Sequence, residues 1–262
     1  LLGKVKGPVL GWSMREPGAV GDRLKLNSMC GVNLAAHALM NAGQSIRHIH
    51  GNADEPQVRT AIKDALVGKL PEASSPKPIT GELGSESDAQ KALDWLRGKK
   101  IGAVGEAPIG FTPCVYDAKQ IHSTFGLDIR QISIDDAFGR ISEVKEEARE
   151  LAYANAVAAQ PSLAAVNVEE AKKVYGVEVA LDEWRKEEVL DAIAIRCWPE
   201  FPTDLGACIC SSLGRLSDRG TVTTCERDVL GAVTMMVCES LGSDENYLVD
   251  IVDLDASQGL VR

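Results

Sequence analysis

Apolar positions along the N-terminal part of the chain follow two alternating patterns. Short apolar runs predict strands at 8–12 and 45–50, and apolar residues at helical spacing predict helices at 26–42 and 57–68. Gly43 follows the first of these helices, at a position where glycine commonly ends a helix. The order strand, helix, strand, helix is typical of an α/β layer.

The segment 71–88 interrupts this alternation. It is rich in Pro, Ser and Gly and has no apolar periodicity, which is typical of a connection between domains. We therefore expect residues 1–88 to form part of an N-terminal α/β domain together with a linker.

A second alternation of strands and helices follows the connection. Strands are predicted at 100–105, 128–133, 193–198 and 221–225, and helices at 89–97, 116–124, 134–160, 167–175, 181–195, 205–213 and 229–241. The apolar run of the third strand predicts that it is buried on both faces of a parallel sheet. Residues 89–220 are therefore expected to form a second, Rossmann-like α/β domain.

Composition and charge narrow the classes of function. The 262 residues carry a formal net charge of −10, from 38 acidic and 28 basic residues, which disfavours nucleic-acid binding because that binding relies on Lys and Arg to neutralise phosphates. No apolar run is long enough to span a membrane, and no leader pattern opens the sequence. The seven cysteines, an odd number in apolar surroundings, favour reduced thiols and a cytoplasmic protein.

Acidic residues mark two predicted transitions from strand to helix. Glu200 follows the strand at 193–198, and Glu226 and Asp228 directly precede the helix at 229–241. Open α/β sheets bind ligands at such strand exits, and carboxylates there suit a hard divalent cation. In an extended segment, Glu226 and Asp228 share one face. The alternative is that they only cap the helix that follows.

Other candidate motifs give weaker signals. His48 and His50 lie on one face of a predicted strand, a spacing that suits either metal ligation or two partly exposed imidazoles. Gly102, Gly105 and Gly110 do not match the dinucleotide-binding pattern G-x-G-x-x-G. The sequence has no signature of a Walker-type ATPase, a nucleophile-elbow hydrolase or a zincin metalloprotease.

Four segments, taken together, are similar to the L-fucose isomerase and L-arabinose isomerase superfamily. They are Trp12–Ala19, Lys100–Phe111, Arg196–Glu200 and Cys225–Ala232. The resemblance extends in order over nearly the whole chain. It is strongest at the last segment, where an acidic pair is followed by an apolar stretch and Gly-Ala.

The resemblance implies a metal-dependent aldose–ketose isomerase that acts on a free monosaccharide through a cis-enediol intermediate, with Mn²⁺ or a similar divalent cation. Carried over residue by residue, Glu200 and Asp228 would be metal ligands and catalytic acid/base groups, and Glu226 would be the alternative ligand. The residues that would bind the substrate are Trp12, Arg15, His50 and Trp198.

The resemblance also implies an overall organisation. The expected fold has two consecutive Rossmann-like α/β domains with parallel sheets, followed by the start of a C-terminal β-rich domain at 221–262. Family members carry a histidine ligand in that domain, and no histidine follows His122 here, so the chain is expected to lack most of it. The expected assembly is a homo-oligomer, a trimer or hexamer, with active sites shared between subunits. The alternative function is a non-catalytic sugar-binding or regulatory α/β protein with the same fold.

Overall fold

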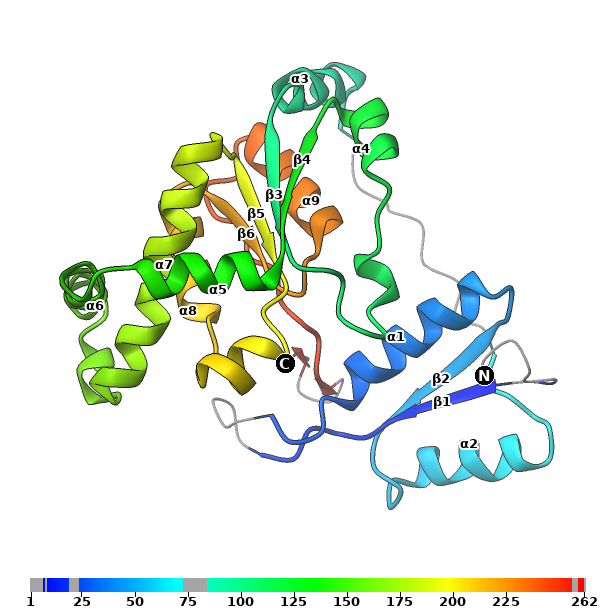
Figure 1. Ribbon diagram of the computed structural model, residues 1–262. Coiled ribbons are helices and arrows are strands. Elements are labelled where there is room, and N and C mark those ends of the chain that lie inside the picture. The colour runs from blue at the N-terminus through cyan, green and yellow to red at the C-terminus, as the bar shows by residue number, and fades with distance from the viewer. Residues whose placement is uncertain (1–6, 8, 19–23, 73–83, 256–258, 262) are drawn as a thin grey trace. The chain divides into compact units, whose positions relative to one another are not determined.

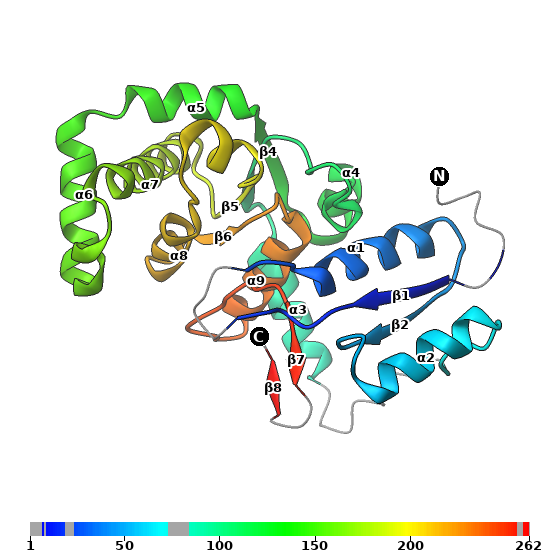
Figure 2. The same ribbon diagram turned by 90° about the horizontal axis from the view of Figure 1, so that it is seen from below.

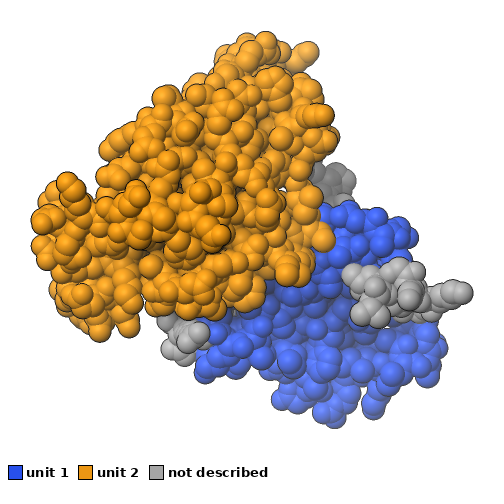
Figure 3. Space-filling model, viewed as in Figure 1, with its two compact units in different colours: residues 1–82, 249–262 blue, residues 83–248 orange. Residues whose placement is uncertain are grey.

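The computed structural model describes residues 7, 9–18, 24–72, 84–255 and 259–261. The chain divides into two compact units, residues 1–82 with 249–262 and residues 83–248 (Figure 3). Each unit combines helices with a parallel sheet, so the predicted α/β class is confirmed. The division between the units falls inside the predicted connection at 71–88, most of which lies outside the described residues.

The first unit is built on a pair of parallel strands. Its elements are β1 (Val9–Ser13), α1 (Ser28–Asn41), β2 (Ile46–His50), α2 (Pro56–Leu66), β7 (Leu254–Asp255) and β8 (Leu260–Val261). β1 and β2 lie side by side between α1 and α2 (Figure 2), and their register pairs Ser13 with His50. β7 and β8 form a separate antiparallel pair. The polar carboxyl ends of β1 and β2 therefore lie next to each other.

The second unit contains a parallel sheet with the strand order β4-β3-β5-β6. Its strands are β3 (Lys100–Val104), β4 (Asp128–Ile132), β5 (Ala192–Ile195) and β6 (Val222–Thr224). Its helices are α3 (Glu86–Leu96), η2 (Thr112–Cys114), α4 (Ala118–Phe125), α5 (Ile134–Glu143), α6 (Glu146–Ala159), η3 (Pro161–Ala165), α7 (Val168–Glu188), η4 (Phe201–Leu205), α8 (Cys210–Asp218) and α9 (Val229–Ser240). The expected boundary between residues 220 and 221 falls inside this unit.

Alternate residues of the central strands face two separate cores. In β5, Ile193 and Ile195 pack in a cluster with Trp184, whereas Ala192 and Ala194 belong to the cluster formed with α9. All four strand residues are completely buried, which confirms the predicted burial on both faces. Helices α5, α7 and α8 cover one face of the sheet, and α3, α4 and α9 cover the other (Figure 1).

Gly102 in the middle of β3 makes room for a large aromatic ring. A Cβ atom at this position would lie 2.6 Å from the Trp184 ring and 2.6 Å from a methyl group of Leu190. Trp184 is almost completely buried, with 1% of its surface exposed. This glycine therefore allows α7 to approach the sheet closely, and it has a packing role rather than a role in a phosphate-binding loop.

The predicted helices at 167–175 and 181–195 are wrong, because these residues form the single helix α7 followed by β5. The chain stays helical through Gly176, where a Cβ atom would lie 2.2 Å from the Arg149 guanidinium. A neighbouring side chain therefore requires a glycine at this position. Asn167 caps α7, since its side chain accepts hydrogen bonds from two backbone N–H groups.

Two other helix predictions are also wrong. The region 134–160 forms α5 and α6, because Val144 adopts an extended conformation and inserts its side chain into the core. The helix expected at 205–213 begins only at Cys210, after the short π-helical segment η4. Within the described part of the chain, no helix combines the length and apolar character that crossing a membrane requires.

Candidate active site

The carboxyl edge of the sheet in the second unit contains a cavity of about 450 Å³. β4 and β5 flank β3 on opposite sides, so this edge includes the point where the strand order changes direction, which is where open α/β sheets bind ligands. Residues from three strand ends line the cavity. Glu106 follows β3, Gln131 lies on β4, and Arg196 and Glu200 follow β5.

Glu200, a predicted catalytic residue and metal ligand, lies in this cavity and pairs with Arg196. The Arg196 Nε–H donates to Glu200 Oε2 over 2.9 Å, and a second guanidinium nitrogen lies 2.5 Å from Oε1. Both side chains are mostly buried, with 17% and 23% of their surface exposed. A bidentate pair of this kind is strong and directional, so both carboxylate oxygens of Glu200 are already occupied.

Glu106 is a second carboxylate in the same cavity, and it is held differently. The Gln131 side-chain amide donates to Glu106 Oε1 over 2.7 Å, while Oε2 lies 3.9 Å from the Arg227 guanidinium. Arg227 in turn donates to the amide oxygen of Gln131 over 3.2 Å. Because this contact fixes the orientation of the amide, Arg227 and Gln131 together position Glu106.

Arg227 is itself held rigidly. Only 6% of its surface is exposed, it donates to the Tyr116 hydroxyl over 3.1 Å, and it lies 4.8 Å from the centre of the Tyr116 ring. Its Nε atom is buried without a hydrogen-bond partner among the described residues. A buried guanidinium with an incomplete set of partners is costly, which is more typical of a functional site than of a purely structural contact.

The turn that carries the second acidic motif is strained. Glu226 and Arg227 have φ angles of 58° and 57°, in the left-handed region that costs of order 1–3 kcal/mol per non-glycine residue. The expectation that Glu226 and Asp228 share a face of an extended segment is therefore wrong. The turn rotates Arg227, rather than Glu226, toward Gln131 and Tyr116.

Asp228 caps α9, as the alternative interpretation expects, and its role as a catalytic group or metal ligand stays a prediction. Its Oδ1 accepts the Gly231 backbone N–H over 2.8 Å. A Cβ atom at Gly231 would lie 2.5 Å from Oδ2, so the glycine leaves room for the carboxylate. The cap accounts for the position of Asp228 by itself, without a ligand.

These carboxylates, as they lie in the structure, do not form a metal site. Among the described residues, no group of three or more His, Cys, Asp or Glu side chains could hold a metal ion. Both oxygens of Glu200 contact Arg196, and Asp228 is engaged as a helix cap. Metal coordination by Glu200, Glu226 and Asp228 would therefore require Arg196 to move away and further ligands to join.

Three of the four predicted substrate-binding residues lie together in the first unit. The Trp12 indole N–H donates to the carbonyl of Gly51 over 2.9 Å. Arg15 donates to both oxygens of Glu55, over 2.6 and 3.0 Å, and lies 3.8 Å from Asp253. The fourth residue, Trp198, belongs to the second unit, where 54% of its surface is exposed.

His50 and His48 converge on one hydroxyl group in this first unit. Ser13 Oγ lies 2.9 Å from His50 Nδ1 and 2.7 Å from His48 Nε2, so the two imidazoles share a strand face as predicted. His50 Nε2 lies 2.7 Å from Asp253 Oδ1. The histidine nitrogens that contact Ser13 and Asp253 are engaged in hydrogen bonds rather than in metal ligation.

The pKa values of Glu55 and His48, both in the first unit, are lowered by their surroundings. The hydrogen bond from Arg15, with a further one from the Asn52 backbone N–H, lowers the pKa of Glu55 to about 2. Burial, followed by the neighbouring His50, lowers the pKa of His48. At neutral pH, Glu55 is therefore ionised and His48 is neutral.

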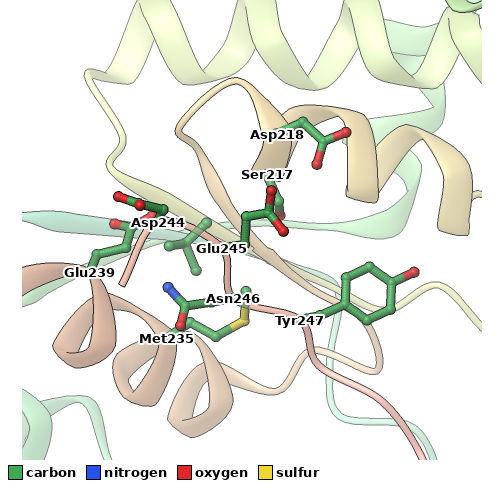
Figure 4. A pocket seen from close by; sticks show the side chains of 9 residues that line it. Ser217, Asp218, Met235, Glu239, Asp244, Glu245, Asn246 and Tyr247 are labelled. Atoms are coloured by element: carbon green, nitrogen blue, oxygen red, sulfur yellow. The ribbon is translucent and has the colours of Figure 1, made fainter. Parts of the chain in front are cut away.

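A second cavity, of about 540 Å³, lies at the opposite edge of the sheet in the second unit (Figure 4). It borders the amino end of β6, and the carboxylates that line it are Asp218, Glu239, Asp244 and Glu245. Burial raises the pKa of Glu239. Ligand sites of parallel sheets lie at carboxyl ends, so this cavity is not the candidate active site.

Sequence reasoning missed several of these residues. Glu106 lies in the loop after the buried strand β3, as Glu200 lies after β5, and this position could have identified it. Arg227 lies within the acidic motif but its role depends on a left-handed turn that the sequence did not indicate. Ser13 and Asp253 come together only through long-range contacts with His50.

The fold and the cavity together define an α/β protein with a polar candidate ligand site at the carboxyl edge of a parallel sheet. No family model matches the chain. The chain is similar to curated proteins named sulfoquinovose isomerase. The relative from Alkalicoccus urumqiensis is 32% identical over 251 residues, 95% of this chain and 51% of the relative. The relative from Priestia aryabhattai is 30% identical over 271 residues, 100% of this chain and 54% of the relative.

A third relative of the same name, from Clostridium sp. strain MSTE9, is 29% identical over 97% of this chain and 52% of its own length. The chain thus spans about half the length of the curated relatives it matches. These matches overturn the resemblance to the L-fucose and L-arabinose isomerases, because sulfoquinovose isomerase is a different family. The expectation of a shortened C-terminal domain rested on that resemblance and falls with it.

Comparison with solved structures adds no argument about function. A LacI-family transcription repressor from Corynebacterium glutamicum matches over 89% of this chain and 91% of its own, with 12% identity and a TM-score of 0.22. A glucose-galactose binding protein from Geobacillus stearothermophilus matches with a TM-score of 0.20 and 14% identity over 92% of this chain and 94% of its own. Both scores are too low to support a common fold.

Proposed function

We propose that this chain acts in an aldose–ketose isomerase whose substrate is sulfoquinovose or a closely related sulfonated sugar. The observation that carries the proposal is the similarity to sulfoquinovose isomerases over 95% and 100% of the chain, at 32% and 30% identity. The cavity at the carboxyl edge of the second unit is the proposed place of the chemistry.

The reaction leaves the molecular formula of the sugar unchanged and moves only hydrogen atoms within it. It therefore needs groups that accept and donate protons. A base removes the proton from C2 of the open-chain aldose while the C1 carbonyl oxygen gains a proton, which gives a cis-enediol. A proton then returns to C1, and the C2 hydroxyl loses its proton and becomes the ketone carbonyl. Carboxylates within hydrogen-bond reach of these atoms are suitable acid/base groups, and each contributes on the order of 10²–10⁴ in rate. The cavity offers Glu106 and Glu200 for this purpose.

Glu106 is the better proton acceptor of the two in this geometry. Its Oε2 makes only a long contact with Arg227, at 3.9 Å, and 76% of its side-chain surface is exposed. Glu200 is paired with Arg196 through both oxygens. We propose that Glu106 transfers the proton and that Arg196 and Glu200 orient the sugar oxygens. Asp228 was predicted from the sequence as the second catalytic carboxylate. It stays in the proposal, and substitutions that separate catalysis from helix capping test its role.

The charge of the cavity bears on which part of the sugar it accepts. Arg196 is outnumbered by the lining carboxylates, which are Glu106, Asp135, Asp136, Glu200 and Asp204. Carboxylates accept hydrogen bonds from hydroxyl groups and repel a sulfonate. We propose that the cavity holds the hydroxyl-bearing end of the sugar, and that the sulfonate lies outside it.

Dependence on Mn²⁺ or a similar divalent cation remains a proposal that rests on the acidic motifs alone. A bound cation would polarise the sugar carbonyl, and Glu200, Glu226 and Asp228 are the residues that would contribute to holding it. Since these side chains do not form a metal site as they lie, no step above is routed through the ion. Turnover before and after treatment with a chelator tests this part independently of the isomerase activity.

The test uses the full-length protein and sulfoquinovose in D₂O, with the ketose product followed by NMR. Proton transfer through an enediol exchanges with solvent, so deuterium should appear in the product. Glu106→Gln should lower kcat on the order of 10²-fold or more, while Glu147→Gln, an exposed residue on α6, should leave it unchanged. Binding of the sugar without turnover in the parent protein would favour the alternative of a non-catalytic sugar-binding protein.

Further parts of the proposal concern organisation. We propose that both units are Rossmann-like α/β domains, that the protein is cytoplasmic, and that it forms a homo-oligomer, a trimer or hexamer, with shared active sites. Large apolar side chains on the first unit support an assembly, since Leu66 and Val67 are 82% and 72% exposed. Light scattering of the full-length protein measures its mass directly.

A further inference from the structure

Arg196 has hydrogen-bond donors that its partner Glu200 leaves unused. The Nε and Nη2 atoms of Arg196 contact the two carboxylate oxygens of Glu200. The remaining nitrogen, Nη1, carries two further N–H donors. Within the described residues Nη1 makes no hydrogen bond, and it is not one of the buried side-chain atoms that lack a partner. Nη1 is therefore accessible, and because Arg196 lines the cavity, a ligand there can reach it.

The guanidinium of Arg196 is held firmly in place. Glu200 directly precedes η4, whose first residue, Phe201, is completely buried and packs against Phe138 with the ring centroids 5.0 Å apart. The bidentate pair fixes the plane of the guanidinium as well as its position. Only 17% of the Arg196 side chain is exposed. A donor held in this way is preorganised, so the reaction does not have to order it.

Arg196 and the proposed base, Glu106, enter the cavity from adjacent strand ends. The Arg196 backbone N–H donates to the Val104 carbonyl over 3.0 Å, and Gly105 follows Val104 with a φ angle of 74°. A Cβ atom at Gly105 would lie 3.3 Å from Arg196 Cβ, so the two strand ends are in close contact. Glu106 is the next residue and lines the same cavity. A sugar bound there can meet the carboxylate and the guanidinium together.

The proposed isomerisation places negative charge on two sugar oxygens in turn. When Glu106 takes the proton from C2, the C–H electron pair enters a C1=C2 double bond, and the carbonyl π electrons move to the C1 oxygen. That oxygen is negative until a water molecule gives it a proton. In the second half, the C2 hydroxyl gives its proton to the hydroxide left behind, and the C2 oxygen becomes the ketone oxygen as Glu106 returns its proton to C1. Both anions are enediolates, and the carboxylates that line the cavity repel them.

We propose that Arg196 is the catalytic residue that binds the enediolate through Nη1, and that Glu200 is the positioning residue that holds Arg196 in place. The cis arrangement puts both oxygens on one side of the double bond, so one nitrogen with two hydrogens can serve each of them. Arg196 stays protonated throughout. Glu200 offsets part of its charge, so the stabilisation depends mainly on the two N–H donors, which act more strongly in a partly buried site than in water. This role rests on the proposed isomerase function and adds the group that stabilises the negative charge.

The expected kinetic result is a loss of kcat rather than of substrate affinity. In the full-length protein with sulfoquinovose, Arg196→Gln should lower kcat on the order of 10²–10³-fold, the usual effect of removing an oxyanion donor, and leave KM within about threefold. Glu200→Gln keeps an oxygen that accepts from Arg196 and should lower kcat only about tenfold, because a charge-assisted hydrogen bond becomes a neutral one. Arg140→Gln, which breaks an Arg–Glu pair on α5 outside the cavity lining, is the control and should leave both constants unchanged.

Binding of two inhibitors separates this role from a structural one. A sulfonated aldonohydroxamate, one carbon shorter than the sugar, imitates the enediolate when it is ionised, whereas the alditol made by reducing sulfoquinovose imitates the neutral substrate. Analogues of the transition state depend on the interactions that stabilise it. Titration calorimetry should therefore show that Arg196→Gln weakens binding of the hydroxamate by about 10²-fold and binding of the alditol by less than about threefold. Equal weakening of both would show that Arg196 only shapes the cavity, and would overturn the catalytic role.

A second variant covers the case in which Arg196→Gln fails to fold, since that change leaves Glu200 mostly buried without its partner. Arg196→Met combined with Glu200→Met removes the pair without leaving an unpaired charge, and such replacements are often neutral for stability. The same loss of kcat and of hydroxamate binding is expected. Turnover close to that of the parent in either variant would overturn the role of Arg196 while the isomerase function stands. Absence of turnover in the parent would reject the proposed function, and the role of Arg196 would fall with it.

Discussion

Asp228 has two competing roles, and a pair of substitutions separates them. As a helix cap, its Oδ1 accepts the Gly231 N–H over 2.8 Å. As a catalytic group or metal ligand, it would act through its negative charge. Asp228→Asn keeps an oxygen acceptor at the same position but removes the charge, whereas Asp228→Ala removes both.

The two roles predict effects of different kinds. Asn is as good an N-cap as Asp, so Asp228→Asn should leave stability unchanged, whereas Asp228→Ala should cost about 1 kcal/mol. For a cooperative unit of this size, that loss lowers Tm by roughly 2–4 °C. If the carboxylate transfers a proton or holds a cation, Asp228→Asn should lower kcat by about 10³-fold, equivalent to roughly 4 kcal/mol of transition-state stabilisation.

We expect Asp228→Asn to keep the parent Tm and to lose turnover. Calorimetry measures the first quantity, and the NMR assay of the ketose product measures the second. Retained turnover in Asp228→Asn, together with a lowered Tm in Asp228→Ala, would show that the residue is only a cap. Loss of both activity and Tm in Asp228→Asn would refute the reasoning about the cap itself.

Three further predictions concern stability. Gly102→Ala places a Cβ atom 2.6 Å from the Trp184 ring and should destabilise the second unit by about 1–3 kcal/mol. Urea unfolding measures this loss, and a double mutant with Trp184→Leu should recover part of it. Glu178, 3% exposed, pairs with Arg215 at 2.8 Å and with Arg219. Glu178→Gln should cost about 1–3 kcal/mol in the same urea assay, because the half-buried Arg215 loses its charged hydrogen-bond partner. The pKa of Glu55 is lowered to about 2, so its stabilisation of the first unit is present above pH 4.5 and lost as the pH falls toward 2; Glu55→Gln should remove that part of the acid dependence, and an unchanged acid profile would contradict it.

The hydrophobic pattern predicted most strands and helices because burial leaves a direct record in the sequence. The alternation in β5 between Ile193 and Ala194 reflects two cores, one on each face of the sheet. The prediction of two helices in place of the single helix α7 was wrong because the contact that decides this point leaves no record in the local sequence. Gly176 resembles a helix end locally, but its missing Cβ is filled by Arg149, a contact that no local pattern records.

The candidate sites were predictable only in part. Glu200 could be placed because it follows a buried strand, and Glu106 is in an equivalent position. The direction in which the Arg227 side chain points could not be predicted. Its φ angle of 57° is unusual for a non-glycine residue and is stabilised by contacts with residues far away in the sequence. The contact between His50 and Asp253 joins residues 203 positions apart, and neither carries a local signal of the other.

The division of the chain into units has a consequence for its synthesis. Residues 83–248 form one uninterrupted stretch, whereas the first unit takes its residues from both sides of that stretch. During synthesis, the second unit is therefore complete before the first unit is, although domains usually fold in order from the N-terminus. His50 can contact Asp253 only once residue 253 has been made, so a released chain that ends at residue 248 should contain a complete second unit and an incomplete first unit.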